Sequence, residues 1–261
     1  MEKEDKEIPK NKFLTAIEEG DLQTVKTLLF DSDNNKFDME GDLITAADYG
    51  HIEIVRFLIQ NNTDINHINS TKDTALTLAA EQGHTEIVRF LIQNNTDINH
   101  INSTKDTALT LAAEQGHTEI VNLLITNGAN VNHINSTKDT ALTLAAEQGH
   151  TEIVNLLITN GANVNHKTKF GNTALTKAAK NGHLNVVDLL IANDADINQI
   201  NLRGETALIR AQKQKHTKVE KILTKQCSLE SNKNEINATN YNNKPSIKVT
   251  VLLVQKNSNL Y

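Results

Sequence analysis

Residues 84–116 read HTEIVRFLIQNNTDINHINSTKDTALTLAAEQG, and this stretch decides the fold because the chain repeats it. Residues 51–83 match it at every position except Ile52, which stands against Thr85. A histidine recurs at a fixed interval of 33 residues, at His51, His84, His117, His150, His183 and His216. A constant period of this length is typical of solenoids, in which like units stack in a row. We therefore expect one elongated stack rather than a single globular core.

Each repeated unit predicts two short helices followed by an irregular loop. Residues 74–82 are rich in helix formers, begin at a Thr suited to an N-cap and stop at Gly83. Residues 86–93 carry apolar side chains at helical spacing, and residues 94–100 are rich in turn formers. Helices this short are not stable alone in water, so their apolar faces must pack against neighbouring units.

Short motifs within the unit identify its type. The chain reads Thr-Ala-Leu-Thr at 74–77, 107–110 and 140–143, each followed by Gly-His, and closes two units with Gly-Ala-Asn-Val-Asn at 128–132 and 161–165. These residues resemble the ankyrin repeat, whose motif has Thr-Pro-Leu-His, Ala-Ala, Gly-His and a closing Gly-Ala-Asp-Val-Asn. The resemblance covers roughly residues 10 to 225. It implies an all-α solenoid of helix-turn-helix units with protruding β-hairpin-like fingers.

The chain departs from the ankyrin pattern at three positions of the unit. The Pro of the motif is Ala75 and its equivalents, and the His of the motif is a Thr at 77, 110, 143 and 176. The family's Gly at the finger tip is replaced by Lys72, Lys105 and Lys138. A Lys with positive φ is strained. We therefore expect these three fingers to be rebuilt or more mobile.

The composition changes at both ends of the repeated region. Residues 1–10 are charged and are expected to fray, and residues 11–225 are expected to form about seven units including two caps. Residues 226–261 are Asn-rich and predict a largely disordered tail. Within this tail, residues 247–254 form a β-prone run. The run predicts either a segment that packs on the cap or a peptide that adds to the sheet edge of another protein.

Charge and motif content argue against several functional classes. A net charge of −6 is unlike the basic face of a nucleic-acid binder, and no apolar run approaches the ~20 residues of a membrane span. Cys227 is the only cysteine, and no stretch resembles a phosphate-binding loop or an oriented nucleophile and base. We therefore predict a monomeric cytoplasmic protein that is not an enzyme and that has no catalytic or cofactor-binding residues.

A second column of histidines lies in the predicted fingers and invites a metal interpretation. Its members are His67, His100, His133 and His166. Packed helices of neighbouring units lie about 8–10 Å apart, whereas metal ligands lie about 2 Å from the ion. The histidines of successive units are therefore too far apart to share a metal. We expect them to form hydrogen bonds between units and predict no metal site.

The resemblance places the partner-binding surface on the concave face of the solenoid. Carried over by position, this face is uniform and slightly acidic in the middle and basic at its C-terminal end. We expect the main contacts at that end, at Lys167, Lys169, Phe170, Lys180 and Arg203, while Phe37 and Tyr49 occupy equivalent positions at the other end. A basic patch in an acidic protein predicts an acidic partner segment. Alternatively, this unit is older than the copied ones and drifted, with Phe170 tucked against its own finger. The uniform middle of the face is expected either to act as a spacer between the two ends or to bind a repetitive ligand through many weak contacts.

The favoured function is an adaptor that binds another protein and has no activity of its own. One alternative rests on likeness alone: free ankyrin arrays in Asn-rich chains resemble those of intracellular bacteria, some of which secrete such effectors into host cells. A second alternative is that the chain is a substrate of asparaginyl hydroxylase, which acts on the Asn that closes an ankyrin unit. The equivalent residues are Asn66, Asn99, Asn132, Asn165 and Asn198.

Overall fold

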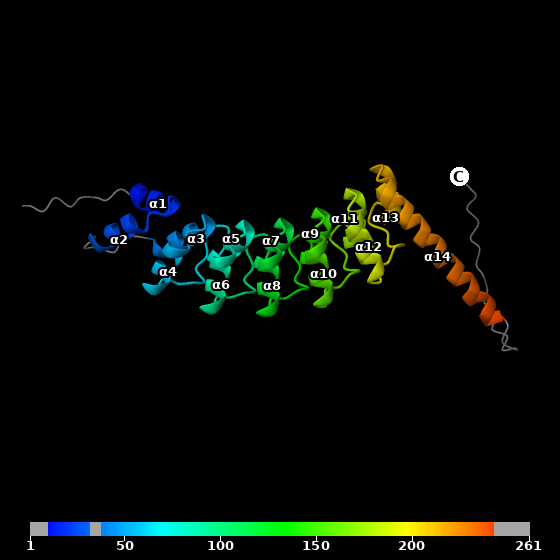
Figure 1. The fold of residues 1–261 in the computed structure, drawn as a ribbon, viewed down its shortest axis with the longest axis horizontal. Helices are drawn as coiled ribbons and strands as arrows, with labels where there is room; N and C mark the ends of the chain where they lie inside the picture. Colours follow the sequence, from blue (N-terminus) through cyan, green and yellow to red (C-terminus); the bar gives the residue numbers. More distant parts are fainter. Residues whose placement is uncertain (1–9, 32–37, 243–261) are drawn as a thin grey trace, which may run out of the picture.

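The computed structural model describes residues 10–31 and 38–242, and these residues form fourteen α-helices and no β-strand. In chain order the helices are α1 (Lys10–Glu18), α2 (Leu22–Asp31), α3 (Met39–Asp48), α4 (Ile52–Gln60), α5 (Ala75–Gln82), α6 (Thr85–Gln93), α7 (Ala108–Gln115), α8 (Thr118–Thr126), α9 (Ala141–Gln148), α10 (Thr151–Thr159), α11 (Ala174–Asn181), α12 (Leu184–Ala192), α13 (Ala207–Lys213) and α14 (Thr217–Asn242). Consecutive helices form pairs, and the pairs stack into one elongated row (Figure 1). The all-α solenoid predicted from the repeat is confirmed.

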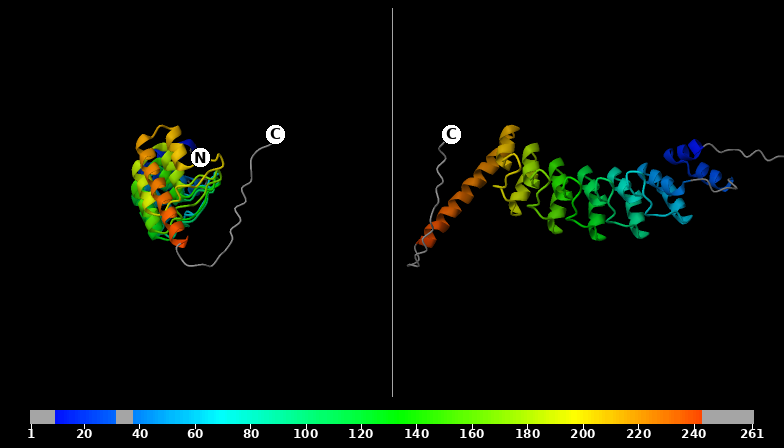
Figure 2. Two further views of the ribbon diagram at one scale, coloured as in Figure 1. Left: turned by 90° about the vertical axis from the view of Figure 1, so that its right-hand side faces the viewer. Right: turned by 180° about the vertical axis from the view of Figure 1, so that it is seen from behind.

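The odd-numbered and even-numbered helices form two rows along the stack (Figure 1). From α3 to α13, each odd-numbered helix packs on the next odd-numbered helix and on its own even-numbered partner. The loops that join one pair to the next project to one side of the helices when the stack is seen end-on (Figure 2). We call these loops the fingers; between α4 and α13 they are residues 61–74, 94–107, 127–140, 160–173 and 193–206.

Threonine and glycine set the ends of the odd-numbered helices. The Thr74 hydroxyl accepts from the Thr77 amide (3.2 Å), and the Thr77 hydroxyl accepts from the Thr74 amide (2.9 Å). This reciprocal capping satisfies two amides that the first turn leaves without a partner. At the other end of α5, Gly83 has φ 86° and lets the chain leave the helix. The same caps recur on α7, α9 and α11, so the Thr that replaces the His of the motif has a structural role.

One apolar core runs through the whole stack, from Phe13 in α1 to Leu223 in α14. The odd-numbered helices contribute small side chains such as Ala79 and Ala80, which are fully buried. The even-numbered helices contribute larger ones, such as Leu91. Because alanine is small, neighbouring odd-numbered helices can approach closely. Fully burying a Leu stabilises the fold by roughly 1.5–3 kcal/mol. Apolar contacts within and between the helix pairs therefore stabilise the stack.

The first histidine column joins each unit to the one before it. His117 Nε2 donates to the carbonyl of Glu81 (2.9 Å), one unit earlier in the stack. The ring lies against Gly83, where an added Cβ would come within 2.6 Å of His117 Cε1. Equivalent bonds are made by His51, His84, His150, His183 and His216. The prediction that the histidines hydrogen-bond between units is confirmed for this column.

The three lysine-tipped fingers keep the turn that glycine would make. Lys72, Lys105 and Lys138 have φ of 62°, 62° and 57°. Two contacts hold the turn at Lys72. Asn69 Oδ1 accepts from the Thr71 and Asp73 amides (3.0 and 2.8 Å), and His100 Nε2 of the next finger donates to the Lys72 carbonyl (2.7 Å). His133 and His166 bind the other two lysine carbonyls in the same way. The prediction that these fingers are rebuilt is therefore wrong, and greater mobility stays a prediction. Three members of the second histidine column, His100, His133 and His166, form the expected hydrogen bonds between units.

The structure differs from the sequence-based expectation at the C-terminal boundary. Helix α14 continues to Asn242, so residues 226–242 are helical, whereas we expected irregular chain from residue 226. Val219 and Leu223 anchor the start of α14 in the core, and the helix meets neither Gly nor Pro over its length. None of the helices in the described ranges is long and apolar enough to cross a membrane. Residues 1–9 and the run 247–254 lie outside the described residues.

Candidate partner-binding surface

The odd-numbered helices and the bases of the fingers share one surface, which we call the inner face. Because the unit repeats, equivalent side chains form columns along it. In the three central units the columns read Asp73, Asp106 and Asp139 at the finger base, Leu78, Leu111 and Leu144 on the helix, and Glu81, Glu114 and Glu147 three residues later. In the next two units these positions hold Asn172, Lys177 and Lys180, then Glu205, Arg210 and Lys213. The inner face therefore changes from acidic to basic between α9 and α11.

Each central unit carries one finger-base Asp and one helix Glu, which we call a carboxylate pair. The first carboxylate pair is Asp73 and Glu81, the second is Asp106 and Glu114, and the third is Asp139 and Glu147.

Lys177 of α11 fills the third carboxylate pair. Its Nζ lies 2.5 Å from Asp139 Oδ1 and 2.6 Å from Glu147 Oε2. The Lys177 side chain is only 10% exposed. A buried ammonium is costly unless it is paired and hydrogen-bonded, and here both carboxylates of the preceding unit serve as partners. The basic residue of one unit thus neutralises the acidic residues of the unit before it.

Arg210 makes a similar bridge one unit further along. Its Nη1 donates to Asn172 Oδ1 (2.9 Å) and lies 3.6 Å from Glu205 Oε2. Lys213 Nζ lies 2.5 Å from Glu205 Oε1. The hydrogen bond from Lys213 is the main reason that the pKa of Glu205 lies below its usual value, with Asn201 adding to the effect. Part of the basic charge at this end of the inner face is therefore used within the chain.

The first and second carboxylate pairs have no such cation. The residues equivalent to Lys177 are Leu111 and Leu144, and within the described residues neither Glu81 nor Glu114 forms an ion pair. Burial raises the pKa of both glutamates, and the Asp of the same pair raises it further. Lys177 of α11 partly offsets this effect on the pKa of Glu114, whereas no cation does so for Glu81. The middle of the inner face thus holds half-buried negative charge that no cation of the described chain pairs directly.

The residues predicted as the C-terminal hot spot lie in two adjoining fingers and at the end of α11. Phe170 is 61% exposed, so it does not tuck against its own finger. The Leu202 amide of the next finger donates to the Phe170 carbonyl (3.0 Å), and the Lys169 amide donates to the Thr137 carbonyl of the preceding finger (2.9 Å). Lys167, Lys169 and Arg203 are exposed, and Lys180 is half-buried near the end of α11. This region presents an aromatic ring among several cations.

At the other end, Tyr49 follows α3, is 52% exposed and stacks on His51 at a centroid distance of 6.4 Å. Phe37 lies outside the described residues. The structure does not bring Tyr49 and Phe170 together, because α3 and α11 are separated by most of the stack (Figure 1). A ligand that contacted both would have to span the units between them.

Sequence reasoning missed one feature of the inner face. This feature is the internal pairing of Lys177 and Arg210, for which the signal was the change from Leu to a basic residue at the equivalent position of the unit. The apolar finger residues, in contrast, were placed on this face from the sequence, and the structure exposes them. Exposed side chains there include Ile68, Ile101, Ile134, Ile200 and Leu202.

The closing asparagines form a ladder between units. Asn99 Oδ1 accepts from the Asn130 amide (2.9 Å), and its Nδ2 donates to the Gly128 carbonyl (3.3 Å). Asn132 and Asn165 repeat both bonds, Asn66 accepts from the next unit, and Asn198 donates to Glu230. These side chains are exposed, yet their amides tie one finger to the next.

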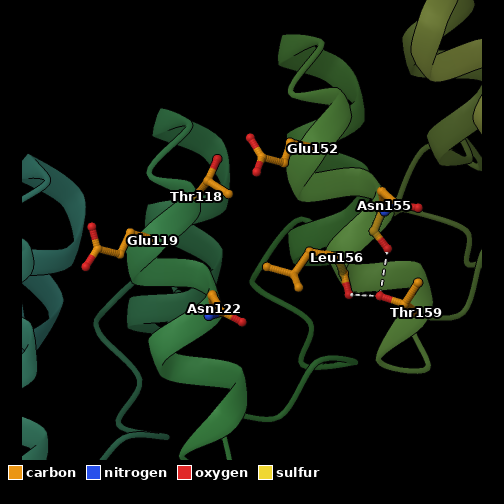
Figure 3. Close-up of a pocket in the computed structure, with 7 residues that line it drawn as sticks. All are labelled: Thr118, Glu119, Asn122, Glu152, Asn155, Leu156 and Thr159. Atoms are coloured by element: carbon orange, nitrogen blue, oxygen red, sulfur yellow. Dashed lines mark hydrogen bonds between the residues drawn. The ribbon is translucent and has the colours of Figure 1, made fainter.

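The structure also contains a shallow depression between α8 and α10, on the even-numbered row (Figure 3). Its lining includes Glu119, Glu152 and Thr159, and the Thr159 hydroxyl donates to the carbonyls of Asn155 and Leu156 (3.0 and 2.9 Å). The hydroxyl is therefore bound to backbone and not to a base. No group of three metal-ligating side chains lies together in the part of the chain that the structure describes.

Comparison with known proteins identifies the repeat. The family model described as Ankyrin repeats (3 copies) matches three times, over residues 13–102, 95–168 and 160–240. A search of curated proteins finds no match.

Proposed function

Because the chain belongs to the ankyrin-repeat family, we propose that it is a non-catalytic adaptor that binds another protein through its inner face. Ankyrin repeats are in general protein-interaction modules, and the partner is specified by the side chains that the units display. The residues of the inner face must therefore identify which surface is used and what the partner carries.

The contrast between the two faces of the stack carries this proposal. On the even-numbered helices, Arg56 Nη2 lies 3.2 Å from Glu86 Oε1, and Arg89 Nη2 lies 2.7 Å from Glu119 Oε1. These two arginines pair with glutamates of the neighbouring unit, and Glu152 further along the row forms no ion pair in the described part of the chain but is exposed to solvent. The inner face instead combines half-buried carboxylates without cations and a row of exposed apolar finger side chains. Unpaired charge beside apolar surface is what a partner can complement.

At the C-terminal end of the inner face, the proposed anchor is Phe170 together with Leu202 of the next finger. Lys167, Lys169 and Arg203 lie in the same two fingers as this anchor, and none of them forms an ion pair within the described ranges. Lys180 completes the patch. The partner segment that reaches this end is proposed to be acidic, so its association should weaken as salt concentration rises.

A pull-down with the full chain, followed by binding of the purified partner to variants, tests this function. We expect Phe170→Ala/Lys169→Glu to weaken binding strongly, whereas Glu152→Ala on the even-numbered row should bind like wild type. Tyr49→Ala reports on the other end of the stack. If Glu152→Ala abolishes binding while the inner-face variant is normal, the proposed surface is wrong. If Tyr49→Ala alone abolishes binding, the anchor lies at the N-terminal end.

Exposure of the closing asparagines favours a second candidate, in which the chain is a substrate of an asparaginyl hydroxylase. Five equivalent side chains are accessible, at Asn66, Asn99, Asn132, Asn165 and Asn198. Incubation with such an enzyme should raise the intact mass by one oxygen for each modified residue, and an unchanged mass removes this candidate.

A further inference from the structure

One carboxylate pair of the inner face already binds a cationic side chain, which comes from the chain itself. Lys177 places its ammonium within hydrogen-bond distance of both members of the third carboxylate pair. The first and second carboxylate pairs contain the same residue types at equivalent positions of nearly identical units. They differ in that the residue corresponding to Lys177 is a leucine, at Leu111 and Leu144.

We propose that the first and second carboxylate pairs each bind one cationic side chain, Lys or Arg, from a basic segment of the partner protein. The proposal rests on the proposed function, since the segment belongs to the protein that the inner face binds. It assigns to the middle of the stack a chemistry opposite to that of the basic patch around Phe170.

The state of the two pairs supports a cation as the missing partner. Glu81 and Glu114 are half-buried, and each repels the Asp of its own pair. Asp73 and Asp106 cannot move away, because Asn102 and Asn135 of the next finger donate to them (both 2.9 Å). An ammonium or guanidinium is positively charged and only donates hydrogen bonds, so it would pair with both carboxylates and relieve the repulsion. A metal ion fits less well, since no three ligating side chains lie together in the described part of the chain.

The spacing of the pairs specifies the spacing of the cations. Packed helices of neighbouring units lie about 8–10 Å apart, and the first and second pairs are one unit apart. An extended polyproline-II segment rises about 3.1 Å per residue and returns to the same side every third residue, which gives about 9 Å. Basic residues three apart in such a segment therefore face successive pairs.

The first test is a titration of the full chain with a labelled extended peptide that carries two lysines three residues apart. We expect Glu81→Gln/Glu114→Gln to weaken binding about tenfold, which corresponds to ~1.4 kcal/mol. The matched control is Glu86→Gln/Glu119→Gln, which removes the same charge from exposed residues of the even-numbered row. This control should bind within about twofold of wild type, because screening weakens distant charges. A peptide with glutamine in place of both lysines should not bind.

The second test uses two substitutions, each of which introduces the residue found at the equivalent position of a neighbouring unit. Leu144→Lys supplies an internal cation to the second pair, as Lys177 does to the third, and should weaken peptide binding. Lys177→Leu releases the third pair, so a third lysine three residues further along the peptide should strengthen binding about tenfold. Both variants should fold, because each residue stands at the equivalent position of a neighbouring unit.

Equal peptide affinity in wild type and Glu81→Gln/Glu114→Gln overturns this inference, as does failure of the wild-type chain to bind the peptide. It is also overturned if Lys177→Leu gives no gain for the third lysine. None of these results removes the proposed function, which fails only if the purified partner binds without using the inner face.

Discussion

Gly116 offers the sharpest test of how the units are joined. It has φ 88°, and an added Cβ would lie 2.7 Å from Cε1 of His150 in the next unit. In Gly116→Ala, the left-handed backbone costs the new residue about 1–2 kcal/mol. The His150 ring must also move, which breaks its bond to the Glu114 carbonyl (3.0 Å) and costs about 1 kcal/mol. We therefore expect a loss of about 2–3 kcal/mol in the free energy of unfolding.

Gly128 is the matched control for this substitution. Its φ is 91°, but no atom lies within 4 Å of an added Cβ, so Gly128→Ala should lose only the backbone contribution of about 1–2 kcal/mol. Urea unfolding followed by circular dichroism measures both losses. In a His150→Ala background, Gly116→Ala should cost no more than Gly128→Ala. Equal losses for the two glycine variants in the wild-type background would refute the inter-unit account.

The chain itself agrees with this distinction. The column of Gly128 also holds Asn62, Asn95 and Asp194, all with φ between 61° and 64°. The column of Gly116 holds glycine wherever the histidine of a following unit packs on it. Lys215 stands in this column at the last unit, with φ 62°, where no further repeat follows. Glycine is thus retained where space is needed and replaced where only the backbone angle is needed.

Three further predictions concern stability. Deleting residues 84–116 should leave a cooperatively folding, shorter stack, because the rejoined interface already occurs in the chain; a broad or absent thermal transition by circular dichroism contradicts this. Leu91→Ala, at a fully buried position, should lose roughly 2–5 kcal/mol in urea unfolding, whereas exposed Gln93→Ala should lose less than about 0.5 kcal/mol. Folding raises the pKa of Glu81 and Glu114, so the folded chain binds more protons and stability should fall as pH rises from the ordinary glutamate pKa through the raised one. The double variant Glu81→Gln/Glu114→Gln should lack this fall. If its stability depends on pH in the same way as that of the wild type, the expected effect of the two glutamates is absent.

Most of the fold was predictable because its signals are local. The threonine before each odd-numbered helix and the glycine after it mark the helix ends in the sequence itself, and the fixed histidine spacing sets the stacking. The lysine-tipped fingers were not predictable, because the support for Lys72 comes from His100 in the next unit. The length of α14 was missed because its Asn-rich sequence has weak helix preference but contains no residue that stops the helix.

The candidate site was only partly predictable. Exposure of Phe170 and its neighbours follows from their places in the fingers, and the structure agrees. The role of Lys177 could not be read directly, because its partners Asp139 and Glu147 are 38 and 30 residues away in sequence. A comparison of units within the chain shows that Leu has become Lys, but only the three-dimensional stack shows which carboxylates the new cation meets.

The claim that the inner face is the partner-binding surface is tested most directly by amide hydrogen exchange of the full chain, measured with and without the purified partner. The account predicts that the partner slows exchange in the fingers and in the odd-numbered helices α5, α7, α9 and α11. Exchange in the even-numbered helices α6, α8 and α10 should change little. Protection confined to α6, α8 and α10 would contradict the account.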